Sequence, residues 1–428
     1  MLARVAVALR PLSSPRGREE RNIRRLLMHT GLFGVVNGGA ITFLPVLLAR
    51  LGASALVVSL LTALPALLTI LMALPAGVIV RRWRRPAIYS GRCFYIMRLC
   101  YLPIIAFFAL APAQAPLLIV IVWGLSAIPS TLGNAIFYDI LAEAISPRRR
   151  PVINGIRWAA LGLTTAVSVA IFGQLLDVLP WPTNYVVVFV VSFLVGMTTT
   201  TIYSRLEVPP RDLPAVLNRM PLRKQVAEAL HPLRADGRFG LLLAVTSVLR
   251  LGLFLPSGLY SIFWVRHLQA TDAWIGYRST IENVALTAGY YFWGRVTSRR
   301  GYAPVVVAAA LGTSICPVLT GLVTRDNRDL LLGVAMLGGF FASGFDVSLF
   351  EWLLSVMPAG ERPRYVAINT AIANLIAFAG PIIGAAVADR AGIPPVLFAA
   401  GGFVLLSGVL ASRVVGRQVR PVRERSVT

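Results

Sequence analysis

Long apolar stretches alternate with short polar connections along the 428-residue chain. A helix needs about 20 mostly apolar residues to cross the hydrocarbon core of a membrane, because its backbone polar groups find no water there. Twelve stretches are long enough and predict an all-α integral membrane protein with twelve transmembrane helices. The predicted spans are 27–49, 55–80, 89–112, 116–145, 152–176, 184–205, 239–264, 272–293, 302–323, 330–357, 365–388 and 393–413.

The longest polar connection falls between the sixth and seventh spans and divides the chain into two groups of six. A repeat supports this division, because Leu51 precedes Gly77 by the same 26 residues that separate Leu268 from Gly294. We therefore predict two pseudo-symmetric six-helix bundles. The predicted parts are a basic N-terminal tail 1–26, a bundle 27–205, a linker 206–238, a second bundle 239–413 and a basic tail 414–428.

Composition supports a membrane protein, since 57% of the residues are hydrophobic, only 14% are charged and the mean hydropathy is +0.73. In a soluble protein the net charge of +23 would suggest a nucleic-acid partner. Here 33 of the 41 Lys and Arg residues lie in alternate connections and in the two tails, against five in the other connections. This is the distribution of cytoplasmic loops, so we expect no nucleic acid and both termini in the cytoplasm of a cell inner (plasma) membrane.

Several chemistries find no support in the sequence. The three cysteines lie within apolar stretches, and the three histidines have no metal-ligand spacing. No phosphate-binding loop with a GxxxxGK[ST] pattern is present. We therefore predict no catalytic set, no metal and no cofactor. The expected partners are the lipid bilayer and an unidentified small-molecule substrate, and the chain is expected to be a monomer.

Two glycine-arginine motifs follow the second and eighth predicted spans. The first reads Gly77-Val-Ile-Val-Arg81-Arg82-Trp-Arg84-Arg85, and the second reads Gly294-Arg-Val-Thr-Ser298-Arg299-Arg300. With the twelve spans, these motifs give the chain a resemblance to the major facilitator superfamily, although Arg81 and Ser298 stand where that family carries an acid. The resemblance implies two bundles that rock about a central midplane site.

Acidic residues recur near both arginine clusters. Asp139 and Glu143 share one helix face near the cytoplasmic end of the fourth span, and Asp139 plus an offset of 212 gives Glu351 in the tenth. We interpret them as candidates for a cytoplasmic gate, with simple solvation of helix ends as the alternative. The gate candidates are Gly77, Arg82, Arg85, Asp139, Glu143, Gly294, Arg299, Arg300 and Glu351.

Charged residues inside spans are costly and are functional candidates by default. Arg250 and Asp346 form the leading pair, because the resemblance places the seventh and tenth helices at the cavity. Arg278 and Glu282 are four residues apart and are either a second site or a mutually neutralising pair. Asn37 and Asn134 are polar candidates or hydrogen-bonding links between helices. Arg98 is not counted as a site; we expect it to snorkel or to brace the second helix.

The favoured function is secondary active transport of a small solute by alternating access, with proton coupling left open. One alternative is a flippase or exporter of lipids or hydrophobic compounds with the same fold. A membrane-embedded enzyme or assembly factor is a further alternative, but a clustered nucleophile, base or metal set would be needed to favour it.

The charge distribution predicts the side on which each connection lies. A single cysteine introduced at Ser298, in a background without native cysteines, is expected to resist an impermeant thiol reagent added outside intact cells. The same cysteine should react once the membrane is opened. Labelling from outside would reverse the predicted orientation.

Overall fold

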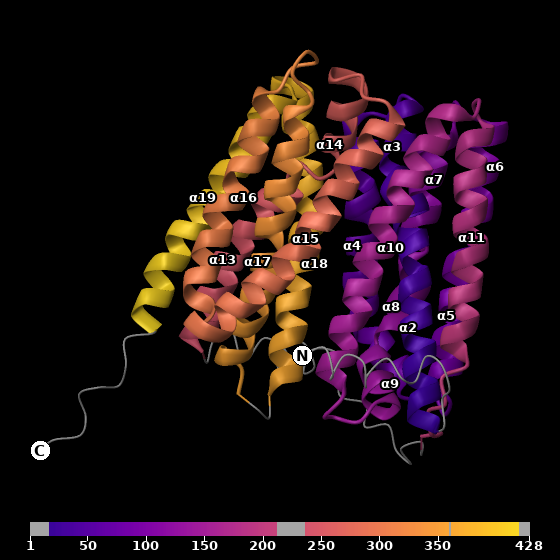
Figure 1. Cartoon of the computed structure of the whole chain (residues 1–428), viewed down its shortest axis with the longest axis vertical. Helices are drawn as coiled ribbons and strands as arrows, with labels where there is room; N and C mark the ends of the chain where they lie inside the picture. Colours follow the sequence, from indigo (N-terminus) through magenta and orange to yellow (C-terminus); the bar gives the residue numbers. More distant parts are fainter. Residues whose placement is uncertain (1–16, 212–235, 359–360, 419–428) are drawn as a thin grey trace, which may run out of the picture. The chain divides into compact units, whose positions relative to one another are not determined.

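The computed structural model describes residues 17–211, 236–358 and 361–418, and Figure 1 shows its elements. These residues are helical along most of their length. The other parts of the predicted tails 1–26 and 414–428, and most of the linker 206–238, lie outside the described residues. The described helices fall into two compact units that differ from a simple division at the linker, because residues Tyr260–Asn283 cluster with the first half of the chain.

The first unit contains the helices of residues up to Leu217, together with Tyr260–Asn283. Its first membrane helix is α2, which continues through a π-helical turn into α3. The elements are α2 (Arg18–Val36), the π-turn Asn37–Ile41, α3 (Thr42–Arg50), α4 (Ala55–Val80), α5 (Pro86–Leu99), α6 (Tyr101–Leu110), α7 (Ala115–Leu125), α8 (Ala127–Asn134), α9 (Phe137–Ala144), α10 (Arg150–Val178) and α11 (Thr183–Ser204). A later segment adds α14 (Leu259–Ile262), the π-turn Phe263–His267 and the first part of α15 (Asp272–Arg300).

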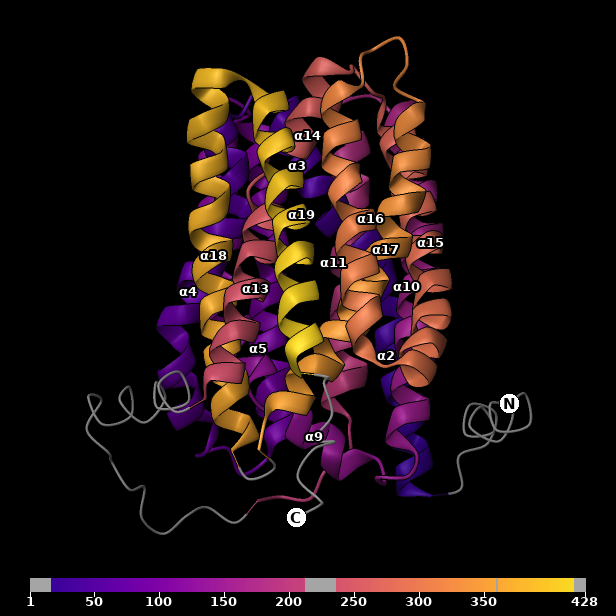
Figure 2. The same cartoon turned by 90° about the vertical axis from the view of Figure 1, so that its left-hand side faces the viewer.

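The second unit contains α13 (Gly237–Phe254), the rest of α15, α16 (Tyr302–Leu322), α17 (Leu330–Val356), α18 (Arg362–Ala391) and α19 (Ile393–Gln418). Within it, α16 packs against α17 and α19, and α13 packs against α18 and α19 (Figure 2). The Asp236 side chain accepts hydrogen bonds from the first backbone N–H groups of α13, which gives this helix a defined start.

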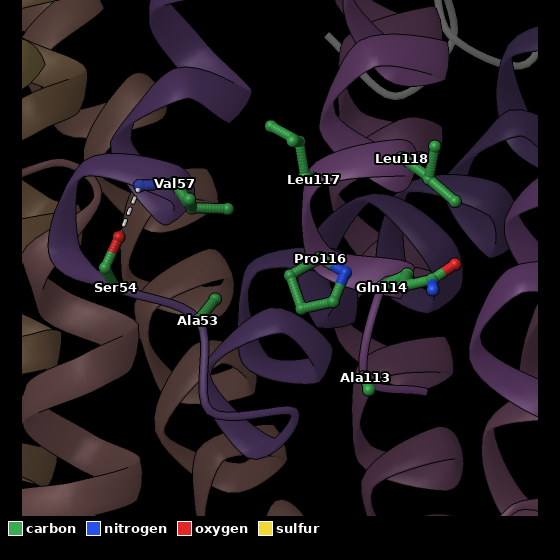
Figure 3. A pocket seen from close by; sticks show the side chains of 8 residues that line it. All are labelled: Ala53, Ser54, Val57, Ala113, Gln114, Pro116, Leu117 and Leu118. Carbon is green, nitrogen blue, oxygen red and sulfur yellow. Dashed lines mark hydrogen bonds between the residues drawn. The ribbon is translucent and has the colours of Figure 1, made fainter. Parts of the chain in front are cut away.

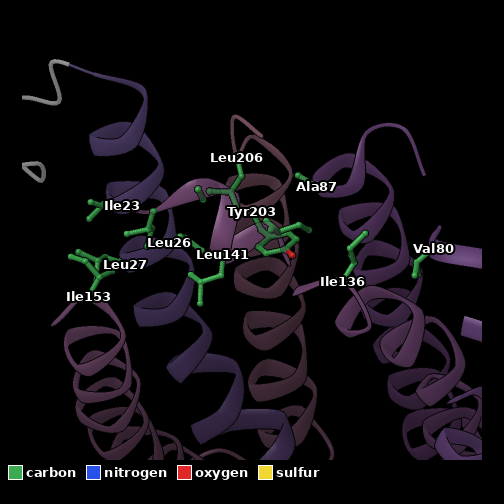
Figure 4. Packing of buried hydrophobic residues seen from close by; sticks show 13 residues of the cluster. Ile23, Leu26, Leu27, Val80, Ala87, Ile136, Leu141, Ile153, Tyr203 and Leu206 are labelled. Carbon is green, nitrogen blue, oxygen red and sulfur yellow. The ribbon is translucent and has the colours of Figure 1, made fainter. Parts of the chain in front are cut away.

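Buried apolar side chains hold one end of the first unit together (Figure 4). Leu26 of α2, Ile140 of α9 and Tyr203 of α11 are each about 1% exposed. The Ser90 hydroxyl donates to the Gly133 carbonyl and to the Tyr203 hydroxyl, so the polar atoms inside this cluster are satisfied. The cluster comprises Ile23, Leu26, Leu27, Val80, Ala87, Ile136, Ile140, Leu141, Ala144, Ile145, Ile153, Tyr203 and Leu206.

Eleven helical stretches among the described residues are long and apolar enough to cross a membrane. The predicted eighth span, 272–293, is helical within α15 but is not among them, because Asp272, Arg278 and Glu282 interrupt its apolar character. Twelve transmembrane helices therefore remain a prediction. The first helix begins at Arg18, nine residues before the predicted start of 27, since Asn22 and Ile23 are already buried in the fold.

Candidate functional site

The leading candidates, Arg250 and Asp346, each have a partner within the second unit. Arg250 lies on α13, is half-buried, and donates from Nη1 to the backbone carbonyl of Asn369 on α18 at 3.4 Å. Asp346 on α17 accepts a hydrogen bond from the Tyr290 hydroxyl of α15 at 2.5 Å. No ion pair joins Arg250 to Asp346 in the described part of the chain. Their role in binding stays a prediction.

Arg278 and Glu282 form an ion pair on α15 within the first unit, with Nη1 and Oε2 2.8 Å apart. The Arg278 guanidinium also lies over the Trp264 ring, 4.3 Å from its centroid, and Trp264 stacks on Tyr260. The Arg278 side chain is 14% exposed and that of Glu282 is 42% exposed. Two aromatic rings, a shielded cation and an accessible carboxylate are thus gathered in one place.

The two asparagine candidates make different contacts. Asn37 begins the π-turn of the first helix and donates from Nδ2 to the Thr165 hydroxyl of α10 at 3.3 Å, which links two helices. Such turns are frequent at functional sites. Asn134 is exposed and bonds within its own helix, to the Ser130 carbonyl at 2.9 Å. Neither contact tests a binding role.

The cytoplasmic gate candidates are arranged differently from the predicted pairing. Asp139 pairs with Arg211 at 3.1 Å, and the backbone N–H of Arg211 donates to the Arg84 carbonyl, which holds Arg211 beside the arginine cluster. Among the described residues no ion pair joins Arg82 or Arg85 to Asp139 or Glu143, or joins Glu351 to Arg299 or Arg300. Gly77 and Gly294 have open space where a Cβ would stand. The gate therefore stays a prediction.

Arg98 does not snorkel. It is 4% exposed, and its guanidinium lies over the rings of Phe33 and Tyr101, with Nη1 donating to the Tyr101 hydroxyl at 3.0 Å. Its methylene chain packs against Gly196 of α11. These neighbours belong to the first, third and sixth helices, and Nε has no hydrogen-bond partner among the residues that the structure describes.

A network that the sequence analysis did not identify surrounds Asp272 in the first unit. Its carboxylate accepts from Arg50 Nη2 at 3.1 Å and from the Tyr185 hydroxyl at 3.2 Å. Asp177, at the end of α10, accepts from the backbone N–H groups of Asp272 and Ala273 at 2.9 and 3.1 Å. Asp177 thus caps α15 from another helix, where a negative charge also complements the helix dipole.

Close backbone packing accompanies this network. A Cβ added at Gly173 of α10 would lie 2.9 Å from the Asp272 carbonyl oxygen, so a larger residue would push α15 away. Arg266 donates to the carbonyls of Ala49 and Ala53 at 3.2 and 2.5 Å. Two signals in the sequence pointed here: Arg50 and Arg266 are among the five basic residues in the connections predicted to lie opposite the cytoplasm, and Asp177 recurs as Asp389 at the offset of 212.

A second unpredicted network joins the start of α2 to the chain beyond α11. The Glu207 carboxylate accepts from Arg21 at 2.7 Å and from Arg25 at 2.8 Å, and the buried Asn22 side chain pairs with the Glu207 backbone. Hydrogen bonds from Arg21 are the main cause that lowers the pKa of Glu207 to about 2, with a further contribution from Arg25.

The first unit also contains an apolar groove of about 530 Å³ (Figure 3). Gln114 supplies its only side-chain amide, and the Ser54 hydroxyl is engaged with the Val57 backbone N–H at 3.3 Å. None of the predicted site residues lies there. Its lining is Ala53, Ser54, Val57, Ala113, Gln114, Pro116, Leu117 and Leu118. Among the residues that the structure describes, no group of three or more His, Cys, Asp or Glu residues could hold a metal ion.

Comparison with known proteins identifies the class. The model of the Major Facilitator Superfamily matches residues 26–263 and again residues 242–427. The chain belongs to the Major Facilitator Superfamily, as the motifs indicated. It is thereby a multi-pass membrane protein of a transporter family, and the reading as a membrane enzyme or assembly factor is set aside.

Individual relatives are distant. The chain is similar to Multidrug resistance protein MdtG of Serratia proteamaculans (strain 568), with 28% identity over 178 residues, covering 41% of each chain. MdtG of Dickeya zeae (strain Ech586) is 27% identical over 163 residues, or 37% of this chain and 38% of the relative. The similarity thus spans about two fifths of these relatives. A crystal structure of a bacterial homologue of the iron transporter ferroportin, inward-facing, shares the fold with a TM-score of 0.71 at 14% identity, covering 92% of this chain and 98% of that one.

The Asp272 network predicts a measurable change in accessibility. Ser279, 8% exposed, lies beside Thr280, whose hydroxyl donates to the Ala166 carbonyl of α10. In a cysteine-free background, Ser279→Cys is expected to react at least about tenfold faster with a thiol reagent when Asp272→Asn is added, because hydrogen bonds to a charged group contribute about 1.5–3 kcal/mol.

Asp326→Asn is the matched control for that experiment, since Asp326 is exposed and lies on the same predicted side of the membrane. It should leave the rate of Ser279→Cys labelling unchanged. An Asp272→Asn protein of normal thermal stability that reacts at the original rate would show that this network does not hold α15 in place.

The Glu207 pKa predicts a pH-dependent contribution to stability. A lowered pKa in the folded state stabilises the protein above the ordinary glutamate value of about 4.3, and this contribution disappears as the pH falls toward 2. The melting temperature of Glu207→Gln should therefore lie below that of the natural sequence at neutral pH. The gap should narrow between about pH 4.3 and pH 2, and a constant gap would contradict the assignment.

Proposed function

We propose that this chain is a secondary transporter that exports amphipathic organic compounds by alternating access. The observation that carries the proposal is the double match of one transporter family model to both halves of the chain. The relatives named as multidrug resistance proteins support organic compounds as the substrate class. Because these relatives are named for resistance, we prefer export over import as the direction of transport.

The chemistry of the candidate residues suits such substrates. The aromatic pair Tyr260 and Trp264 lies beside Arg278, with the exposed Glu282 carboxylate next to it. Flat apolar groups can stack on the rings, and a carboxylate attracts a cationic group of the substrate. Asp346, hydrogen-bonded to Tyr290 and exposed, supplies a second carboxyl in the other unit and is our candidate for proton coupling.

Alternating access gives the Asp272 network a role. Arg50, Asp177 and Tyr185 bind the start of α15 in this structure. We propose that both termini are cytoplasmic, which puts this network on the opposite side of the membrane. Opening that side then requires these contacts to break, so their strength sets the balance between the two states. We further propose that a monomer performs the cycle.

The proposed residues can be tested in proteoliposomes. With a pH gradient imposed, the natural sequence should accumulate a cationic lipophilic dye, and Asp346→Asn and Glu282→Gln should each reduce the initial rate at least about tenfold. Asp326→Asn serves as the control and should transport normally. Rates are compared per amount of folded protein.

Other outcomes of this assay count against parts of the proposal. Normal transport by both acidic variants would show that neither carboxyl serves substrate or protons. Movement of a fluorescent phospholipid without movement of dye would instead favour the flippase alternative. No gradient-dependent flux of either kind would contradict secondary transport of this substrate class.

A further inference from the structure

A pocket of about 260 Å³ lies where α2 and α11 pack against each other in the first unit. Four arginines and two apolar residues form it, and none of the described residues that line it is acidic. Its members, which we call the arginine pocket, are Arg21, Arg24, Arg25, Met28, Ile202 and Arg205. The transport sites proposed above use none of them.

Only part of this positive charge is neutralised. Glu207 binds Arg21 and Arg25, and it orients them because its backbone is fixed by the buried Asn22. Arg24 and Arg205 are exposed, and neither has a hydrogen bond or an ion pair from its side chain in the described part of the chain. The pocket therefore carries a net positive charge with two guanidinium groups available to an anion.

Two of the four arginines, Arg24 and Arg25, have no basic counterpart in the repeat, whereas Arg21 corresponds to Arg238 and Arg205 to Arg417. The repeat offset of 217 pairs Arg24 and Arg25 of the first helix with Leu241 and Leu242 of the seventh. Leu242 is 2% exposed in an apolar cluster of the second unit, whereas Arg25 faces a pocket. A general excess of basic residues on the cytoplasmic side can be met in any loop, so it does not explain four arginines around one cavity.

The charged residues of the pocket lie nearer the membrane surface than its apolar residues, which is the order of headgroup and acyl chain in a lipid. Arg205 directly follows the end of α11 at Ser204, which is the level of the lipid headgroups for a helix that crosses the membrane. Met28, 41% exposed, and Ile202 lie one turn further into the two helices. Guanidinium groups thus lie at headgroup depth, and apolar side chains lie at the depth of the first acyl carbons.

We propose that the arginine pocket binds the phosphate headgroup of an anionic phospholipid. Arg24 and Arg205 contact the phosphate oxygens, for which the planar guanidinium is well suited, while Met28 and Ile202 contact the acyl chain. Arg21 and Arg25, held by Glu207, form the wall of the site. Anionic lipids of the cytoplasmic leaflet are the natural source of this chemistry under the orientation proposed above.

The test measures lipid binding to the purified full chain by native mass spectrometry and by melting temperature. Dioleoylphosphatidylglycerol should remain bound and raise the melting temperature relative to dioleoylphosphatidylcholine. In the double variant Arg24→Gln with Arg205→Gln, its affinity should fall at least about tenfold, since both free guanidinium groups are lost. Equal melting temperatures of variant and natural protein in phosphatidylcholine would show that the variant is folded.

A matched double variant removes two exposed arginines elsewhere, Arg362→Gln with Arg413→Gln, and should retain full phosphatidylglycerol binding. Three outcomes overturn the proposal: the Arg24 and Arg205 variant binds phosphatidylglycerol normally, the control variant loses as much affinity, or inorganic phosphate gives the same stabilisation without the lipid. If the Arg24 and Arg205 variant is less stable in phosphatidylcholine, the mass spectra decide. Fewer retained phosphatidylglycerol molecules than in the natural protein support the proposal, and an equal number overturns it.

Discussion

The high cost of placing charged and polar groups among apolar helices governs the structure. Each charged side chain of the candidate site meets this cost differently. Arg250 reaches a backbone carbonyl, Asp346 accepts from a tyrosine, and Arg278 combines a carboxylate with an aromatic face. Arg98 lies over aromatic rings and donates to one hydroxyl. These partners contact the charged groups without neutralising them, except where Glu282 pairs with Arg278.

The same cost explains the network around Asp272. A carboxylate on a side chain that is 8% exposed needs several donors, and Arg50 and Tyr185 supply them from two other helices. Asp177 meanwhile satisfies backbone N–H groups that the start of α15 leaves open. The same network therefore satisfies both a buried carboxylate and the open backbone N–H groups at the start of a helix.

The helical class, the family and most helix positions were predictable, because span length and apolar character are local properties of the sequence. The eighth helix shows the limit of this signal, since Asp272, Arg278 and Glu282 break its apolar run while tertiary partners stabilise it. Ion-pair partners could not be read in the same way. Arg50 and Asp272 are 222 positions apart, and Asp139 pairs with Arg211 where the sequence predicted Arg82 or Arg85. Only the fold decides which of several basic residues an acid meets.

The duplication separates what the scaffold needs from what each half has added to it. The offset of 217 pairs Arg250 with Phe33, and Phe33 lies under the buried guanidinium of Arg98. The offset of 212 pairs Asp346 with Asn134, whose side chain donates to Ser130 of its own helix. One bundle thus carries an aromatic or an amide where the other carries a charge. The repeat positions therefore show that the duplicated sequence does not carry these two charges in both halves. Such a residue, costly to bury and absent from its repeat, is therefore the first to test for a role in binding.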